Sequence, residues 1–219
     1  MELLVFGERG MPVIVFPTSR GRFYQFEDFG LVGHVQPRIE EGWLQLWCID
    51  SVDAESFYDG VKAPEERVHR HLEYERYVVE EVLPLVSAEN PAASRCLMGC
   101  SFGAFHAATL ALRHPEVARK VLCLSGAYDA ARWLDGRRDG DCYYVNPIAF
   151  LPGLADERYL GPLRRTDIII ATGDEDPNVE ESRALAALLQ AKDVPAALHI
   201  LPGWQHDWPY WMEMMDVYL

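Results

Sequence analysis

The sequence predicts an α/β fold with a mostly parallel central sheet and helices on both faces. Short apolar runs alternate along the chain with longer stretches of helical periodicity, and the runs are apolar almost throughout. Strands of that kind are buried on both faces, which is typical of parallel sheets covered by helices. With 219 residues and an apolar share of 49%, we expect one domain, 1–219, with a substantial core.

Seven apolar runs are predicted to be strands: 3–6, 13–16, 44–49, 96–100, 121–124, 168–171 and 197–201. The first two are separated only by Gly7-Glu8-Arg9-Gly10, a turn-forming sequence, so we expect an N-terminal antiparallel hairpin. Helices are predicted over 64–86, 104–113 and 179–191, with a closing helix from Trp208.

Residues 128–165 interrupt this alternation. They are long, aromatic and rich in Pro, Gly and Asp, and they show no clear helix or strand period. Long irregular segments in compact domains are usually functional. We therefore expect a cap-like insertion over the functional site.

The charge balance argues against several classes of partner. The net charge is −14, from 34 acidic and 20 basic residues, which disfavours nucleic acid and anionic membranes. We find no run long enough for a transmembrane helix and no signal-peptide pattern. The five cysteines form no CxxC pair, and most lie in or beside apolar runs. We expect a cytoplasmic, disulfide-free protein; a homo-oligomer is compatible with this composition.

The pentapeptide Gly99-Cys100-Ser101-Phe102-Gly103 is the strongest functional motif. It lies between a predicted strand and a predicted helix, the setting of a nucleophile elbow, in which G-x-S-x-G lifts a serine hydroxyl above the sheet edge. The flanking positions must lack side chains, because the turn is strained and the strand and helix approach closely.

Ligands of open α/β sheets bind beyond the carboxyl ends of the strands. Three such ends carry, in chain order, Ser101, a group of acids at 174–176, and His206. Serine, acid and histidine in this order are typical of an α/β-hydrolase triad. The other histidines are read as surface or packing residues, including His106 in the helix after the serine.

These motifs resemble the esterase D-like ("putative esterase") family of α/β-hydrolases, which includes feruloyl esterases, S-formylglutathione hydrolases and mycolyltransferases. The resemblance extends from about Tyr74 to Trp211. It rests on the sequences at 77–84, 99–103, 125–129, 146–147 and 203–211. The last of these is similar to the family's Gly-x-His-Asp-x-x-x-Trp arrangement, with one extra residue between glycine and histidine.

The resemblance implies Ser101 as nucleophile, His206 as base and Asp176 as the acid, from the pattern Gly-x-x-Asp after the penultimate strand. Asp129 is the alternative acid, because some hydrolases place it after the preceding strand. Asp174 is then free to brace the loop, and Glu175 is expected to be solvated.

The oxyanion of the reaction needs backbone donors. One is expected to be the N–H of Phe102, at the start of the helix. The second should come from the loop after strand 13–16, where family members often carry His-Gly. This chain has Pro17-Thr18-Ser19-Arg20-Gly21 instead, and we expect the N–H of Ser19 to serve.

Arg20, Tyr24 and Tyr144 are the residues we expect to bind substrate. The aromatic residues after the oxyanion loop (Phe23, Tyr24, Phe26, Phe29) and in the cap (Tyr143, Tyr144, Phe150) form either an acyl pocket or core. Arg20 and Arg22 either favour a substrate with a carboxylate or pair with surface acids.

The sequence thus predicts a serine esterase that cleaves small-molecule carboxylic esters of small or medium acyl groups through an acyl-enzyme. We expect no cofactor and no metal, since no His, Asp and Cys group has ligand spacing. An acyltransferase using the same triad is the alternative. A catalytically silent binding protein on this fold is a further one, but it predicts a broken triad.

Overall fold

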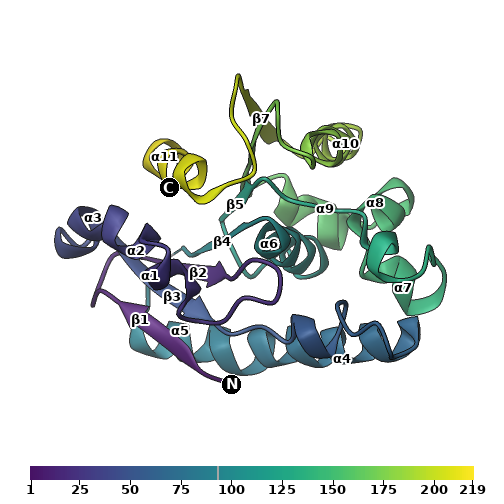
Figure 1. Ribbon diagram of the computed structural model, residues 1–219, viewed down its shortest axis with the longest axis horizontal. Helices are drawn as coiled ribbons and strands as arrows, with labels where there is room; N and C mark the ends of the chain where they lie inside the picture. Colours follow the sequence, from purple (N-terminus) through teal and green to yellow (C-terminus); the bar gives the residue numbers. More distant parts are fainter. Residues whose placement is uncertain (93) are drawn as a thin grey trace.

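A seven-stranded sheet forms the centre of the molecule in the computed structural model, which describes residues 1–92 and 94–219 (Figure 1). The strand order is β1-β3-β2-β4-β5-β6-β7, and only β1 runs antiparallel to its neighbour. The strands are β1 (Leu3–Phe6), β2 (Met11–Phe16), β3 (Leu44–Ile49), β4 (Cys96–Cys100), β5 (Lys120–Leu124), β6 (Asp167–Gly173) and β7 (Ala196–Leu201). The predicted α/β class is confirmed.

The predicted N-terminal hairpin is wrong. β1 pairs with β3, with Leu3 opposite Ile49, and β3 lies between β1 and β2. The turn explains this arrangement. Gly10 has φ 97°, and a Cβ there would lie 2.4 Å from the carbonyl carbon of Trp43. The turn therefore packs onto the chain entering β3, which takes the place that a hairpin partner would occupy.

Helices cover both faces of the sheet. The bounds are α1 (Gln25–Asp28), α2 (Leu31–His34), α3 (Gln36–Glu40), α4 (Pro64–Tyr77), a π-helical segment (Val78–Val82), α5 (Leu83–Glu89), α6 (Phe102–Arg113), α10 (Val179–Gln190) and α11 (Trp208–Tyr218). Alternate residues of each strand point to opposite faces of the sheet and belong to two separate cores. One core contains residues of α4, α5, α6 and α10, and the other contains residues of α2 and α11. None of the helices among the described residues is long and apolar enough to cross a membrane.

The segment 128–165 consists of short helices rather than an open loop. They are Ala130–Trp133, α7 (Gly140–Tyr144), α8 (Pro147–Phe150), Leu151–Gly153 and α9 (Glu157–Leu163). Asn146 and Asp156 cap two of them with their side chains. Such short helices leave no 3.6-residue period in the sequence, which is why they escaped prediction. Their apolar residues Phe150, Leu151, Leu160 and Leu163 are part of the core around α6.

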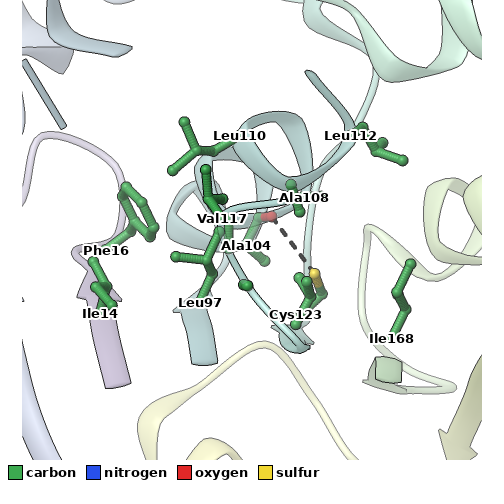
Figure 2. Packing of buried hydrophobic residues seen from close by; sticks show 14 of the residues in the cluster. Ile14, Phe16, Leu97, Ala104, Ala108, Leu110, Leu112, Val117, Cys123 and Ile168 are labelled. Carbon is green, nitrogen blue, oxygen red and sulfur yellow. Dashed lines mark hydrogen bonds between the residues drawn. The ribbon is translucent and has the colours of Figure 1, made fainter. Parts of the chain in front are cut away.

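Small residues let α6 lie close on the sheet. Ala104, Ala107, Ala108 and Ala111 belong to the core that includes residues of the strands. The thiol of Cys123 on β5 donates to the carbonyl of Ala104 at 3.8 Å (Figure 2). All five cysteines are buried free thiols. Burial raises the pKa of Cys48, Cys96 and Cys123 to about 12, so these thiols stay protonated near neutral pH.

His71 on α4 is a buried histidine, and we expect it to make stability pH-dependent. Its ring contacts those of Phe57 and His106, and neither ring nitrogen has a hydrogen-bond partner among the described residues. Burial, aided by His106, lowers its pKa from 6.5 to about 3. Below pH 6.5 the unfolded chain binds a proton here that the folded chain excludes. Acidification from pH 7 to 4.5 should therefore cost about 2–3 kcal/mol of stability through this side chain.

Replacing His71 by Leu should remove that part of the pH dependence, as measured by urea unfolding at pH 7 and pH 4.5. The exposed His69 on the same helix offers the matched control for exchanging a histidine for a leucine, His69→Leu. An equal change in the free energy of unfolding between pH 7 and pH 4.5 in wild type and His71→Leu would contradict this account.

Candidate active site

Ser101 occupies a strained turn between β4 and α6. Its backbone has φ 56° and ψ −120°, a conformation that non-glycine residues rarely adopt. The turn is held on both sides: the N–H of Ser101 donates to the carbonyl of Leu124 at 2.8 Å, and the N–H of Ala104 donates to the carbonyl of Ser101 at 3.1 Å. The side chain is thereby lifted to the carboxyl edge of the sheet.

The two glycines of the elbow are required by close backbone contacts. A Cβ on Gly99 would lie 2.2 Å from the carbonyl carbon of Gly103, and a Cβ on Gly103 would lie 2.3 Å from the carbonyl oxygen of Phe16. The start of α6 therefore lies directly against the end of β2. This contact brings the loop after β2 next to Ser101.

Ser101, His206 and Asp176 form one hydrogen-bonded chain. The Oγ of Ser101 lies 2.9 Å from Nε2 of His206, and Nδ1 of His206 lies 2.9 Å from Oδ2 of Asp176. A carboxylate only accepts, so Nδ1 carries the proton and Nε2 presents its lone pair to the serine hydroxyl. Ser101 follows β4, Asp176 follows β6 and His206 follows β7. His206 lies 105 positions after Ser101 and 30 positions after Asp176 in the chain.

Asp176 is 2% exposed, and its second oxygen accepts the N–H of Asn178 at 2.7 Å. Burial raises the pKa of this carboxyl, but the hydrogen bonds from His206 and the N–H of Asn178 outweigh burial and hold the pKa below its usual value. Asp176 is thus a buried anion beside the imidazole.

The loops that carry Asp176 and His206 are tied together. A Cβ on Gly173 would lie 1.8 Å from the carbonyl oxygen of Trp204, so only glycine permits this approach. Asp174 accepts the N–H of Gly203 at 2.7 Å and braces the loop, and Glu175 accepts from the side chain of Gln205 at the surface.

Tryptophans hold the histidine loop from the side of α11. The ring of Trp211 lies perpendicular to that of His206, with centroids 5.0 Å apart, and Trp208 packs on Trp211 at 4.9 Å. Phe26 and Phe29 pack on Trp208. These two phenylalanines, considered above as pocket residues, therefore support the histidine loop.

Asp129, the alternative acid, has other partners. Its carboxylate accepts from the N–H of Ala131 and from the side chain of Asn146 at 2.7 Å, and it pairs with Arg138. No contact with His206 is found among the described residues. Asp129 joins the start of the 128–165 segment to its middle.

The loop after β2 leaves the N–H of Ser19 free. The neighbouring N–H groups are occupied: Thr18 donates to Oε1 of Gln25 at 2.9 Å, and Arg20 donates to Oδ2 of Asp53 at 3.0 Å. Within residues 1–92 and 94–219, no acceptor is found for the N–H of Ser19 or of Phe102 at the start of α6.

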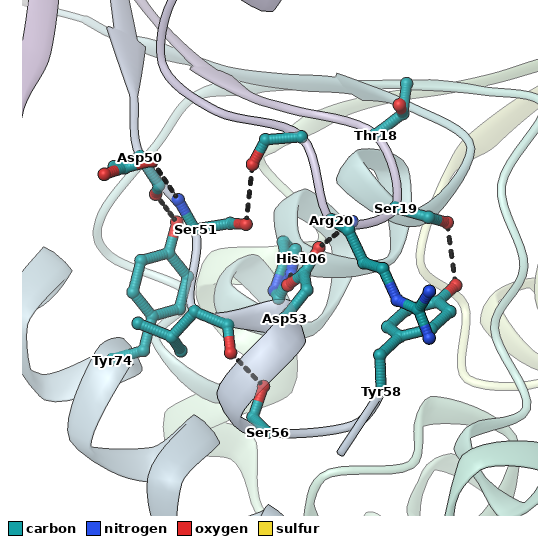
Figure 3. A network of polar contacts seen from close by, with 12 residues as sticks. Thr18, Ser19, Arg20, Asp50, Ser51, Asp53, Ser56, Tyr58, Tyr74 and His106 are labelled. Atoms are coloured by element: carbon teal, nitrogen blue, oxygen red, sulfur yellow. Dashed lines mark hydrogen bonds and ion pairs between the residues drawn. The ribbon is translucent and has the colours of Figure 1, made fainter. Parts of the chain in front are cut away.

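The three expected substrate contacts lie in different places. The guanidinium of Arg20 lies over the ring of Tyr58, 4.9 Å from its centroid (Figure 3). Tyr24 is 43% exposed and packs on Phe23. Tyr144 lies apart from the other two, in a crevice beside the end of α6.

The carbonyl of Tyr144 accepts from Arg113 at the last turn of α6, whereas Ser101 precedes the first turn. A helix of 12 residues is about 18 Å long, so Tyr144 is too distant to contact substrate at Ser101. Tyr143 and Phe150 line the same distant crevice as Tyr144.

Sequence reasoning missed two aromatic residues beside the elbow. The ring of Phe102 contacts those of Tyr58 at 5.2 Å and Trp133 at 4.6 Å, and the hydroxyl groups of Ser19 and Tyr58 are hydrogen-bonded at 2.7 Å. Nothing in the local sequence marks either residue, because Tyr58 lies in a turn and Trp133 in a helix of four residues that leaves no period in the sequence. Arg22, in contrast, is engaged by Asp50 in a two-pronged ion pair.

Several solved structures share this fold at low sequence identity. A ferulic acid esterase superposes with a TM-score of 0.72 at 16% identity, covering 97% of this chain and 88% of its own. An S-formylglutathione hydrolase from Agrobacterium tumefaciens gives 0.72 at 17%, covering 96% and 82%. Esterase PE8 gives 0.61 at 17%, covering 100% and 98%.

No curated protein sequence matches this chain. A family model does, over residues 25–218, and its description is "Putative esterase". The match includes the elbow, both loops that meet at it and the closing helix. The chain therefore belongs to the Putative esterase family, on the α/β-hydrolase fold.

Proposed function

We propose that this protein is a serine hydrolase that cleaves carboxylic esters of small or medium acyl groups through an acyl-enzyme. The hydrogen-bonded chain from Ser101 through His206 to the buried Asp176, with both contacts at 2.9 Å, carries the proposal. Membership of the esterase family and the names of the structural neighbours support ester substrates.

In the proposed reaction, His206 takes the proton of Ser101 as its Oγ attacks the acyl carbonyl. Asp176 keeps the imidazole in the required tautomer and stabilises its charged form. The tetrahedral intermediate collapses, and the leaving alcohol receives the proton from His206. Water then attacks the acyl-enzyme by the same route and frees Ser101.

The N–H groups of Phe102 and Ser19 are the proposed oxyanion donors. Their support is that both are free while the N–H groups on either side of Ser19 are occupied. The start of α6 adds the positive end of the helix dipole at Phe102. A preorganised donor of this kind contributes about 3–4 kcal/mol to transition-state stabilisation.

For the substrate, we propose a small ester with an anionic group, recognised by Arg20. No carboxylate forms an ion pair with Arg20 within the described residues, although the chain has 34 acidic residues. Tyr58 and Trp133 offer an apolar wall beside it. Tyr24 remains a proposed contact at the rim.

Ser101→Ala should abolish labelling by a fluorophosphonate probe and lower kcat for p-nitrophenyl esters by at least about 10³-fold, because the nucleophile is lost. Mass spectrometry of the labelled wild type locates the modified residue. Ser87→Ala, in α5, serves as the control and should keep full activity. Labelling at another residue would refute the proposal.

Asp176→Asn should lower kcat on the order of 10³- to 10⁴-fold, because the amide favours the wrong imidazole tautomer. Asp129→Asn should leave kcat within a fewfold of wild type. Steady-state kinetics on one p-nitrophenyl ester test both variants. Loss of activity in Asp129→Asn alone would overturn the assignment of the acid.

Arg20→Gln should lower kcat/KM for p-nitrophenyl hemisuccinate about two- to fivefold more than for the neutral p-nitrophenyl butyrate, the range expected for a partly exposed ion pair. Arg183→Gln, at an exposed arginine on α10, is the matched control. Equal losses on both esters would contradict recognition of an anion by Arg20.

A further inference from the structure

We propose that the buried pair Asp53–His106 positions the oxyanion loop, making both residues positioning residues for the reaction. The inference rests on the proposed esterase function and extends it to groups that do not touch the substrate. His106 was expected only to pack, and Asp53 carried no expectation from sequence.

Asp53 connects two segments with its two carboxylate oxygens. Oδ1 accepts from Nε2 of His106 at 2.8 Å, and Oδ2 accepts from the backbone N–H of Arg20 at 3.0 Å (Figure 3). Asp53 is 0% exposed and His106 is 3% exposed. A carboxylate this deep is tolerated only when its oxygens are hydrogen-bonded, so both bonds are structurally necessary.

The pair joins the two parts of the proposed oxyanion hole. His106 lies one turn after Phe102 on α6, and its ring contacts that of Phe102 at 4.8 Å. Arg20 directly follows Ser19. The carboxylate of Asp53 thus sets the position of the Ser19 loop relative to the helix that carries Ser101 and Phe102.

The loop needs such a restraint because its backbone is strained. Arg20 has φ 57°, in the left-handed region that non-glycine residues disfavour. Its N–H bond to Asp53 holds the peptide between Ser19 and Arg20, while Gln25 holds Thr18 on the other side. Without Asp53 the Arg20 backbone is free to relax, and the N–H of Ser19 then turns away from the oxyanion.

A second buried carboxylate, hydrogen-bonded to a side chain of α6, is suited as a control. Glu75 of α4 is 7% exposed and accepts from Arg113 at 2.8 Å and from His114 at 2.9 Å. This cluster lies at the far end of α6 from Ser101. Like the Asp53 pair it joins a buried carboxylate to a side chain of α6, but no contact with the oxyanion loop is found among the described residues.

The experiment measures kcat and KM for one p-nitrophenyl ester, and the melting temperature, in wild type and in each variant. Asp53→Ala should lower kcat on the order of 10- to 100-fold with KM within about threefold, since a displaced donor costs up to the effect of a missing one. Glu75→Gln should lower the melting temperature but keep kcat within about twofold. Asp53→Asn, which preserves shape, should fall between wild type and Asp53→Ala.

Variants of His106 supply the rescue. His106→Gln places an amide N–H near the position of Nε2 and should keep kcat within about threefold of wild type. His106→Phe removes the donor and should match Asp53→Ala. Gln and Phe at position 106 both have side chains of a reach similar to that of His. The comparison of His106→Gln with His106→Phe therefore tests the positioning role even if Asp53→Ala does not fold.

Two failures are distinguishable. If wild type reacts with the fluorophosphonate probe and hydrolyses esters, but Asp53→Asn and His106→Phe lose no more kcat than Glu75→Gln, the positioning role is wrong and the proposed function stands. If wild-type Ser101 reacts with neither probe nor ester, the proposed function and this inference fall together.

Discussion

The close approach of α6 to the ends of β4 and β2 is the constraint on which the site depends. Gly99 and Gly103 contact each other's backbone, and Gly103 also contacts the backbone of Phe16. A single methyl group at either position would separate the helix from the sheet. The strained backbone of Ser101 exists because this contact leaves the chain no other way to turn.

The parallel arrangement of the strands then brings distant segments together. Because the carboxyl ends of β4, β6 and β7 lie on the same edge of the sheet, the loops with Ser101, Asp176 and His206 meet there. Gly173 allows the acid loop to pack on the backbone of Trp204, and Trp211 fixes the imidazole. The geometry is held by packing around the loops as well as by the hydrogen bonds between the three side chains.

The two buried carboxylates beside the elbow, Asp176 and Asp53, have different surroundings. Asp176 faces an imidazole that stays partly exposed and reaches Ser101, which suits a group that gains charge during a reaction. Asp53 faces an imidazole that is enclosed by aromatic rings, and its other oxygen holds a backbone N–H. The first arrangement suits proton transfer, and the second suits rigidity.

The sequence by itself determined the α/β class, the positions of the seven strands and of the longer helices after residue 64, the elbow, and Ser101, His206 and the acids at 174–176 as the residues to examine. These follow from local chemistry: apolar periodicity, the glycines of a strained turn, and polar residues directly after strands. The choice of Asp176 among the three acids came from the resemblance to the esterase family. The place of β1 beside β3, the helices within 128–165, the distance of Tyr144 from Ser101 and the Asp53–His106 pair were decided only by the tertiary structure. Each depends on which segments become neighbours across the sheet, and no local pattern encodes such contacts.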